Sequence, residues 1–286
     1  MMHTDDHDHD LGLAHDLERI HQGRMRRRRA LLWLTGAGAA PLFACGGGGS
    51  DSVNTATIGG TTTTPTTPTV TSCAVIPEET AGPYPGDGSN AANGSIANAL
   101  ALSGIVRNDI RSSVGGTTGT AAGVLMAVTL TLVNTNASCT SLAGYAIYLW
   151  HCDRDGKYSM YSSGVTDQNY LRGVQQTNAN GQVTFTTIFP ACYSGRMPHM
   201  HFEVYRSLAT ATASTSKLKT SQIAFPIADG QTVYATTGYS QSVSNLAQIS
   251  FATDNVFSDG TTLEMASLSG SVAAGYAASL TVGNSA

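Results

Sequence analysis

Two histidines separated by a single residue, His199 and His201, form the pattern in this sequence with the clearest chemical potential. On a β-strand, residues i and i+2 point to the same face, so both imidazoles can reach one metal ion. Met200 and Phe202 then point to the opposite face, into a core. Imidazole is a common ligand of transition metals. The pattern predicts a metal site, although a plain polar strand face is the alternative for an isolated His-x-His.

Four motifs occur in order around this pair. They are residues 150–158 (WHCDRDGKY), 172–181 (RGVQQTNANG), 190–196 (PACYSGR) and 199–201 (HMH), with 80–84 (TAGPY) and 220–226 (TSQIAFP) on either side. The series resembles the intradiol ring-cleavage dioxygenases, the family of catechol 1,2-dioxygenase and protocatechuate 3,4-dioxygenase. The resemblance spans roughly residues 73–286. It is strongest to the exported, single-chain members, because the chain has no room for the helical dimerisation domain of the catechol enzymes.

The resemblance implies a non-haem Fe(III) ion as cofactor, held by Tyr158, Tyr193, His199 and His201. Phenolate is a hard, anionic oxygen donor that stabilises ferric iron. The pKa of tyrosine is normally about 10, but coordination to a highly charged ion deprotonates the phenol. This donor set differs from the two histidines and one carboxylate of many ferrous enzymes. A copper or zinc site is the alternative at the same place.

The resemblance also implies the reaction. A catecholic substrate binds as a dianion in place of Tyr193, and O2 attacks a ring carbon that bears oxygen. The ring opens between the two hydroxyl-bearing carbons to give a cis,cis-muconate-type dicarboxylic acid. By position, Arg196 stabilises negative charge on the ring, Gln222 hydrogen-bonds the developing oxyanion, and Tyr84 lines the substrate mouth. The protein is thus expected to be an oxidoreductase that incorporates both atoms of O2.

Three further polar residues lie within or beside the motifs. We expect His151, the only other histidine beyond residue 29, to be a hydrogen-bonded strand residue rather than a ligand. Arg172 is expected to be a partner in a salt bridge. Glu203 shares the face of the histidine pair but lies one step further along the strand, so we expect it at the rim of the site or behind it.

The elements that must position these residues are β-strands. Alternation and β-branched runs predict strands at 128–132, 145–150, 183–186, 199–204, 217–225, 247–251 and 278–282. Turn signals lie at 155–156, 180–181, 229–230 and 259–260. Helices are expected only as short pieces in loops such as 90–101. The pattern predicts an all-β fold, an antiparallel β-sandwich with the metal held by loops and one strand at one end.

Residues 1–44 are typical of an export signal. Four arginines at 26–29 precede an apolar run at 30–43, which is too short to span a bilayer of about 30 Å. Arg28-Arg29 and the long polar segment before them predict export by the twin-arginine route. Cys45 lies where a bacterial lipoprotein is lipidated. We therefore expect a periplasmic protein or one anchored to the bacterial envelope through Cys45, with ordinary cleavage and no lipid as the alternative.

Residues 45–72 are rich in Gly, Thr and Pro. Such a composition predicts a flexible linker, because it offers too little apolar surface to offset the entropy of ordering. Residues 73–286 then form the catalytic domain. Its four cysteines, Cys73, Cys139, Cys152 and Cys192, predict two disulfides in an exported protein, with three connectivities. We favour Cys152–Cys192, because both lie beside the predicted metal loops; buried thiols are the alternative.

Composition narrows the function classes. The 286-residue chain has 12% charged residues and a formal net charge of −4, which gives no electrostatic basis for binding nucleic acid. A non-catalytic exported sandwich that binds aromatics, carbohydrate or a protein partner is the main rival to an enzyme. A structural domain held by disulfides is another. Catechol, protocatechuate, hydroxyquinol and larger catechols all stay open as substrates, as does the oligomeric state.

Overall fold

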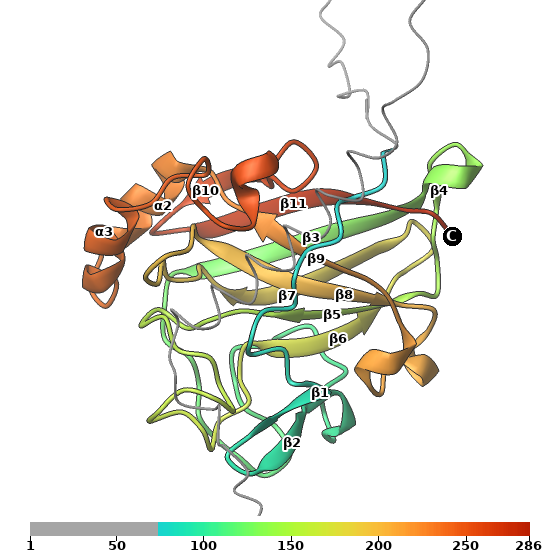
Figure 1. Cartoon of the computed structure of the whole chain (residues 1–286), viewed down its shortest axis with the longest axis horizontal. Helices are drawn as coiled ribbons and strands as arrows, with labels where there is room; N and C mark the ends of the chain where they lie inside the picture. Colours follow the sequence, from blue (N-terminus) through green and yellow to red (C-terminus); the bar gives the residue numbers. More distant parts are fainter. Residues whose placement is uncertain (1–73) are drawn as a thin grey trace, which may run out of the picture. The chain divides into compact units, whose positions relative to one another are not determined.

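Two β-sheets packed face to face dominate residues 74–286, the part of the chain described by the structure, which is a computed structural model (Figure 1). The predicted export signal, the linker, Cys45 and Cys73 lie outside the described residues, so the expectations about them stay predictions. None of the helices within residues 74–286 has the length and hydrophobicity to cross a bilayer.

The first sheet, which we call the site sheet, has the strand order β6-β5-β8-β9 with every neighbouring pair antiparallel. Its strands are β5 (Ala146–Trp150), β6 (Arg172–Gln176), β8 (His199–Tyr205) and β9 (Lys217–Ala224). The second sheet has the order β10-β11-β3-β4, and β7 also pairs with β3. Its strands are β3 (Leu125–Asn134), β4 (Thr140–Ser141), β7 (Gln182–Ile188), β10 (Ser267–Ser271) and β11 (Gly275–Asn284). The predicted all-β sandwich is confirmed, with one difference: β3 and β11 run parallel.

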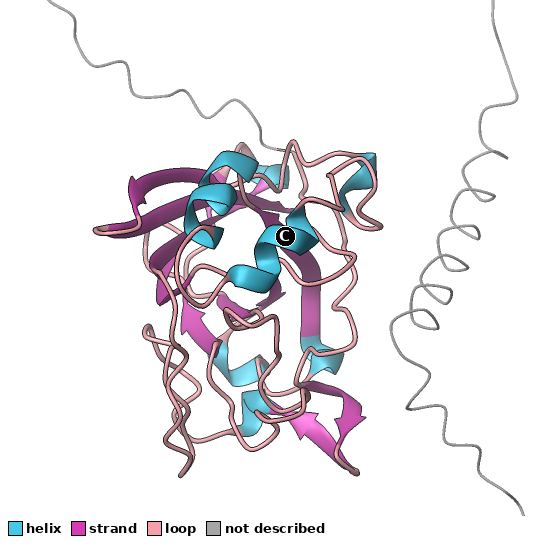
Figure 2. Ribbon diagram, turned by 90° about the vertical axis from the view of Figure 1, so that its left-hand side faces the viewer, coloured by secondary structure: helices cyan, strands magenta, loops and turns pink. Residues whose placement is uncertain are grey.

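Short elements complete this part of the chain. Strands β1 (Asp87–Ala92) and β2 (Ser95–Asn98) form a separate hairpin. Helices α2 (Ile227–Tyr234) and α3 (Ser240–Leu246) lie at one end of the sheets (Figures 1 and 2).

Three local expectations were wrong in whole or in part. Residues 247–251 form no strand: they follow α3 directly, and Ile249 and Phe251 pack against buried clusters from an irregular segment. The short helix expected within 90–101 is confined to a 3-10 turn at Ala99–Ala101, and the preceding residues belong to the β1–β2 hairpin. Asn93 and Gly94 both have positive φ, the geometry that makes Asn-Gly a strong hairpin signal. Asp229-Gly230 lies inside α2 rather than in a turn.

The main core lies between the two sheets. Met200, Phe202 and Val204 of β8 point into it and meet Leu130 and Phe185 of the second sheet. This confirms that the residues alternating with the two histidines face the core. The histidines therefore lie on the other face of the site sheet.

Truncating Phe202 to alanine is expected to lower the free energy of unfolding by about 3–5 kcal/mol, because the fully buried ring would leave a cavity at the centre of the core. Urea denaturation followed by fluorescence measures the change. The matched control is Leu218→Ala, whose side chain on the neighbouring strand is 42% exposed; this change should stay within about 0.5 kcal/mol of wild type. Equal effects of the two substitutions would contradict this packing.

A pH dependence follows from the buried carboxyl of Glu264. Burial, together with the charges of Glu79 and Asp259, raises its pKa from 4.5 to about 8. Since the folded pKa lies above the unfolded value, this carboxyl contributes stability fully below about pH 4.5 and loses that contribution as the pH rises through about 8. The advantage of wild type over Glu264→Gln in urea unfolding should therefore shrink across this range. A constant difference between the two proteins would refute the assignment.

Candidate metal centre

The strand register lines up four residues across the outer face of the site sheet. Trp150 of β5 stands opposite Arg172 of β6 and His201 of β8, and His201 in turn stands opposite Gln222 of β9. Directly opposite residues share a face of the sheet. His199 lies on the same face of β8, two residues before His201. Trp150 stacks on the imidazole of His201, with ring centroids 5.0 Å apart and planes 7° from parallel.

The four predicted ligands meet at the end of this row. Around Nε2 of His199 lie Tyr158 Oη at 3.5 Å, Tyr193 Oη at 3.1 Å and His201 Nε2 at 3.1 Å. Two donor atoms that are each about 2 Å from one ion stand about 3 Å apart. The spacing of these two oxygens and two nitrogens is therefore that of donors around a common centre.

A hydrogen bond fixes the state of His199. Its Nδ1 lies 2.6 Å from the carbonyl oxygen of Met197, so Nδ1 carries the proton and donates it. Nε2 is then left with a lone pair that faces the cluster. Histidine ligands of metals are commonly oriented through such a bond from the other ring nitrogen.

Tyr158 comes from the long loop after β5. Asp153 Oδ1 accepts hydrogen bonds from the backbone N–H groups of Asp155 and Lys157, which tightens the turn that leads to Tyr158. Gly156 has a φ of +79°, and a Cβ there would lie 3.0 Å from Cβ of Tyr193. Glycine at this position lets the loops that carry the two tyrosines approach each other.

Tyr193 lies in the loop between β7 and β8, and α3 holds that loop in place. The backbone N–H of Cys192 donates to the hydroxyl of Ser242, and the side-chain amide of Asn245 donates to the Cys192 carbonyl. Arg196 N–H donates to the Tyr193 carbonyl. The sequence motif 190–196 thus forms a tight turn fastened to a helix some 50 residues downstream.

The electrostatics of the cluster suit a cation. Burial raises the pKa of Tyr158 well above its usual value and that of Tyr193 to about 12, and burial lowers the pKa values of His199 and His201 well below 6.5. Both imidazoles are therefore neutral and able to donate a lone pair. A bound cation would reverse the preference of the phenols and hold them as phenolates. Within residues 74–286, no three His, Cys, Asp or Glu side chains gather at one place, so the oxygen donors of this centre are the two phenols.

Arg196 connects the cluster to Gln222. Its Nη2 donates to Gln222 Oε1 at 2.7 Å, and its Nη1 lies 3.4 Å from His199 Nε2. The Gln222 amide donates to the Thr80 carbonyl at 2.9 Å, which fixes which end faces Arg196. The structure thus brings both residues beside the four donors. Asp254 accepts from Nε of Arg196 at 3.0 Å, a contact that no local pattern predicted.

Tyr84 lies at the edge of the cluster. Its ring centroid is 5.0 Å from that of Tyr158, and the residue is 36% exposed. The chain before it passes close to the histidines: Gly82 has a φ of +68°, and a Cβ there would lie 3.4 Å from Cε1 of His201.

Arg172 forms hydrogen bonds with neutral groups instead of the expected salt bridge. Its guanidinium donates to the carbonyls of Tyr84, Pro85 and Ser159, and to the hydroxyls of Tyr148 and Ser159. A fully buried arginine needs such partners, because unsatisfied donors are costly away from water. Arg172 thereby ties the segment with Tyr84 to the loop with Tyr158.

His151 and Glu203 lie apart from the four donors. Both ring nitrogens of His151 are engaged elsewhere, Nδ1 with the Cys152 carbonyl at 2.8 Å and Nε2 with the Thr187 hydroxyl at 2.6 Å. The Glu203 carboxylate accepts from Tyr205 at 2.7 Å and from Lys217 at 3.0 Å. Both residues therefore lie outside the set of four donors as expected, although His151 comes directly after β5 instead of within a strand.

The favoured disulfide between Cys152 and Cys192 is absent: both residues are free, buried thiols. Each sulfur donates to a backbone carbonyl instead, Cys152 to Ala191 at 3.7 Å and Cys192 to Arg196 at 3.3 Å. Burial raises the pKa of the Cys192 thiol to about 12, so it stays protonated. Cys139, by contrast, is disulfide-bonded.

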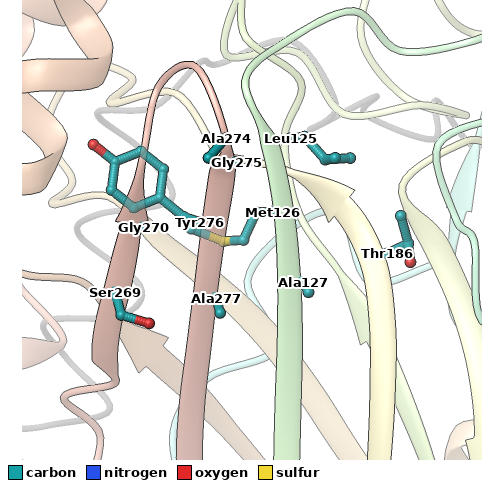
Figure 3. Close-up of a pocket in the computed structure, with 10 residues that line it drawn as sticks. All are labelled: Leu125, Met126, Ala127, Thr186, Ser269, Gly270, Ala274, Gly275, Tyr276 and Ala277. Atoms are coloured by element: carbon teal, nitrogen blue, oxygen red, sulfur yellow. The ribbon is translucent and has the colours of Figure 1, made fainter.

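A groove elsewhere on the surface shares no residue with this centre. It has a volume of about 280 Å³, lies along β3 and the β10–β11 hairpin, and includes Leu125, Met126 and Tyr276 (Figure 3). The chemistry predicted from the motifs is thus separate from this groove.

Comparisons with known proteins agree with the resemblance found in the sequence motifs. Residues 107–227 match a family model described as a dioxygenase. The structure is similar to an intradiol ring-cleavage dioxygenase from Tetranychus urticae, with 25% identity and a TM-score of 0.55, over 73% of this chain and 94% of that one. A second solved dioxygenase has 24% identity and a TM-score of 0.55, over 74% and 94% of the two chains. No curated protein sequence matches this chain.

These matches confirm the predicted resemblance to the intradiol ring-cleavage dioxygenases. They support an oxidoreductase of the dioxygenase type, and the general activity of that family is cleavage of catechol-type rings with O2.

Proposed function

Because the chain resembles the intradiol ring-cleavage dioxygenases in sequence and in fold, we propose that it is a non-haem Fe(III)-dependent member of that type. The proposed reaction consumes one O2 for each catechol and opens the ring between the hydroxyl-bearing carbons, giving a cis,cis-muconate-type dicarboxylic acid. The observation that carries the proposal is the approach of two phenol oxygens and one imidazole nitrogen to within 3.5 Å of His199 Nε2.

Tyr158, Tyr193, His199 and His201 are the residues that would hold the iron. When bound, the ferric ion supplies a Lewis acid that withdraws electron density from a catecholate and makes the ring reactive toward O2. Tyr193 would be the ligand that substrate replaces, and its oxygen would take up a catechol proton. Burial raises the pKa of both tyrosines, so the assignment to Tyr193 rests on its position in the motif 190–196.

Arg196 and Gln222 act on the developing charge. The Arg196 guanidinium adjoins the donors and is already oriented by two side chains, so it stabilises negative charge on the ring without reorganising. Gln222 holds the same guanidinium and donates toward the Thr80 carbonyl at rest. We propose that Tyr84 contacts the substrate at the mouth, because it is half-exposed and packs on Tyr158.

Oxygen-isotope labelling tests this proposal. The iron-loaded full chain, incubated with catechol and ¹⁸O2, should consume equal amounts of both and give a muconate-type diacid with both labelled atoms. An aldehyde product from cleavage outside the hydroxyl pair would overturn the intradiol assignment. Tight binding of catechol with no consumption of O2 by the iron-loaded protein would instead favour a binding module.

We also propose that the protein is exported by the twin-arginine route and is periplasmic or anchored to the envelope through a lipid on Cys45. The arginines at 26–29, the apolar run at 30–43 and the position of Cys45 just after that run support this proposal. Mass spectrometry of the mature N-terminus after fractionation tests it. A diacylated Cys45 is expected, and recovery of the uncleaved chain from the cytoplasm would contradict it.

A further inference from the structure

Asp254 has no assigned role in the proposed function and lies outside the residues matched by the family model. Its side chain is fully buried. The carboxylate accepts from Nε of Arg196 at 3.0 Å and from the backbone N–H of Met197 at 2.6 Å. It also accepts from the N–H groups of Val256 and Phe257, at 2.8 and 3.1 Å. A buried charge with this many partners holds all of them in one arrangement.

One chain of hydrogen bonds leads from Asp254 through Met197 to His199. The peptide group on the N-terminal side of Met197 donates its N–H to Asp254, and the Met197 carbonyl accepts the Nδ1 proton of His199. Asp254 therefore fixes the backbone at Met197. The Met197 carbonyl in turn keeps the proton on Nδ1 of His199, so that the Nε2 lone pair faces the donors. Such partners behind a metal ligand set its orientation and its basicity.

A second chain of hydrogen bonds leads from Asp254 through Arg196 to Gln222. The guanidinium is planar, so a bond at Nε sets the plane in which Nη1 and Nη2 lie. With Nε held by Asp254, Nη2 reaches Gln222 Oε1 and Nη1 lies beside His199. Phe257, whose N–H is also bound by Asp254, lies with its ring centroid 5.7 Å from the Arg196 guanidinium carbon.

We propose that Asp254 is a positioning residue that sets both the proposed ligand His199 and the charge-stabilising Arg196. The proposal rests on the proposed function for its effect on turnover, but its effect on the His199 tautomer is independent of any activity. Asp254→Asn is the sharpest variant. It keeps one oxygen acceptor and the volume, but its amide nitrogen replaces one carboxylate oxygen and places a donor against donors. That oxygen is either Oδ2, which accepts from Arg196 and Met197, or Oδ1, which accepts from Val256 and Phe257.

In the metal-free protein, ¹⁵N chemical shifts of the His199 ring report the tautomer. Wild type is expected to give a single Nδ1–H species, and Asp254→Asn a mixture of tautomers. In the iron-loaded protein, the variant should lose about 10- to 100-fold in kcat, with KM within a few-fold of wild type, and should lose iron faster to a chelator. Glu203→Gln is the control, because it also removes a fully buried carboxyl group, on the strand that carries His199. This control should keep the His199 spectrum and kcat of wild type.

A double variant separates the effect of Asp254 through Arg196 from its effect through His199. In an Arg196→Gln background, Asp254→Asn should cost little further kcat, because that part of its effect acts through Arg196, whereas the faster loss of iron should persist. A single Nδ1–H tautomer and wild-type turnover in Asp254→Asn would overturn the proposal. Equal losses in Asp254→Asn and Glu203→Gln would also overturn it, because they would indicate general destabilisation. If wild type itself cleaves no catechol, the proposed function fails, and the tautomer spectra still decide the role of Asp254.

Discussion

Replacing His199 by alanine is expected to abolish iron binding and ring cleavage together. The Nε2 atom of this residue is the point around which the other three donors lie within 3.5 Å. Its loss removes the donor at the centre of the cluster and leaves two phenols and one imidazole whose spacing was set around that atom. The decrease in kcat/KM should exceed by far the roughly 100-fold that loss of a partner behind a ligand costs. Iron content by elemental analysis and O2 uptake with catechol measure the two losses.

His151→Gln is the matched control, because it removes a second histidine that is just as buried but bonds away from the cluster. This variant should retain one iron per chain and most of the activity, while its stability falls. Full iron content in His199→Ala would contradict the proposed ligand set, and iron loss in His151→Gln would mean that metal retention depends on general stability.

Substituting Arg196 by lysine is expected to lower kcat by about 100- to 1,000-fold, the range for loss of one preorganised donor to developing charge. Lysine keeps the positive charge opposite Asp254 but lacks the planar fork that reaches Gln222 and the donors at once. Iron content should stay close to that of wild type, because Arg196 is not a ligand. Steady-state kinetics on iron-loaded protein measure the effect.

Arg111→Lys provides the control for the chemical change itself. Arg111 pairs with Asp109 at the surface, and both side chains are more than a third exposed. Its substitution should leave kcat unchanged. A wild-type kcat in Arg196→Lys would remove the proposed role of the guanidinium in the reaction.

The sequence pattern alone was sufficient to predict on which face of the strand the two histidines lie. The alternation of His199 and His201 with Met200 and Phe202 needs only the two-residue period of a strand, and the structure confirms the two faces. Tyr158 and Tyr193 sit in loops with no such period. Their approach to the histidines depends on the pairing of β5 with β8 and on Gly156, so only the order of the motifs could associate them with the site.

The wrong expectations for Arg172 and the disulfide, and the missing role of Asp254, have a common cause: the partners are distant in sequence. Arg172 finds its partners in the segment around Pro85, 87 residues earlier, and no local pattern shows that those partners are carbonyls rather than carboxylates. Cys152 and Cys192 were paired because their motifs lie beside the same site, but nearness of motifs does not give the geometry that a disulfide needs. Asp254 was missed for the same reason: its contact with Arg196 spans 58 residues.

The hairpin at 87–98 is a different case, because its signal was present in the sequence. Asn93-Gly94 is a two-residue turn between short strands, and it outweighs the helical preference of the alanines around it. Local turn chemistry was sufficient there, whereas the site itself required the tertiary fold.

The visible spectrum of the iron-loaded protein, recorded under anaerobic conditions before and after addition of catechol, tests the central claim most directly. Two phenolates on a ferric ion should give a broad charge-transfer band that shifts to longer wavelength when catechol binds. The band should be absent in His199→Ala. A protein that stays colourless after loading with ferric or ferrous iron, and that gives no new band with catechol, would contradict the ferric two-tyrosine centre.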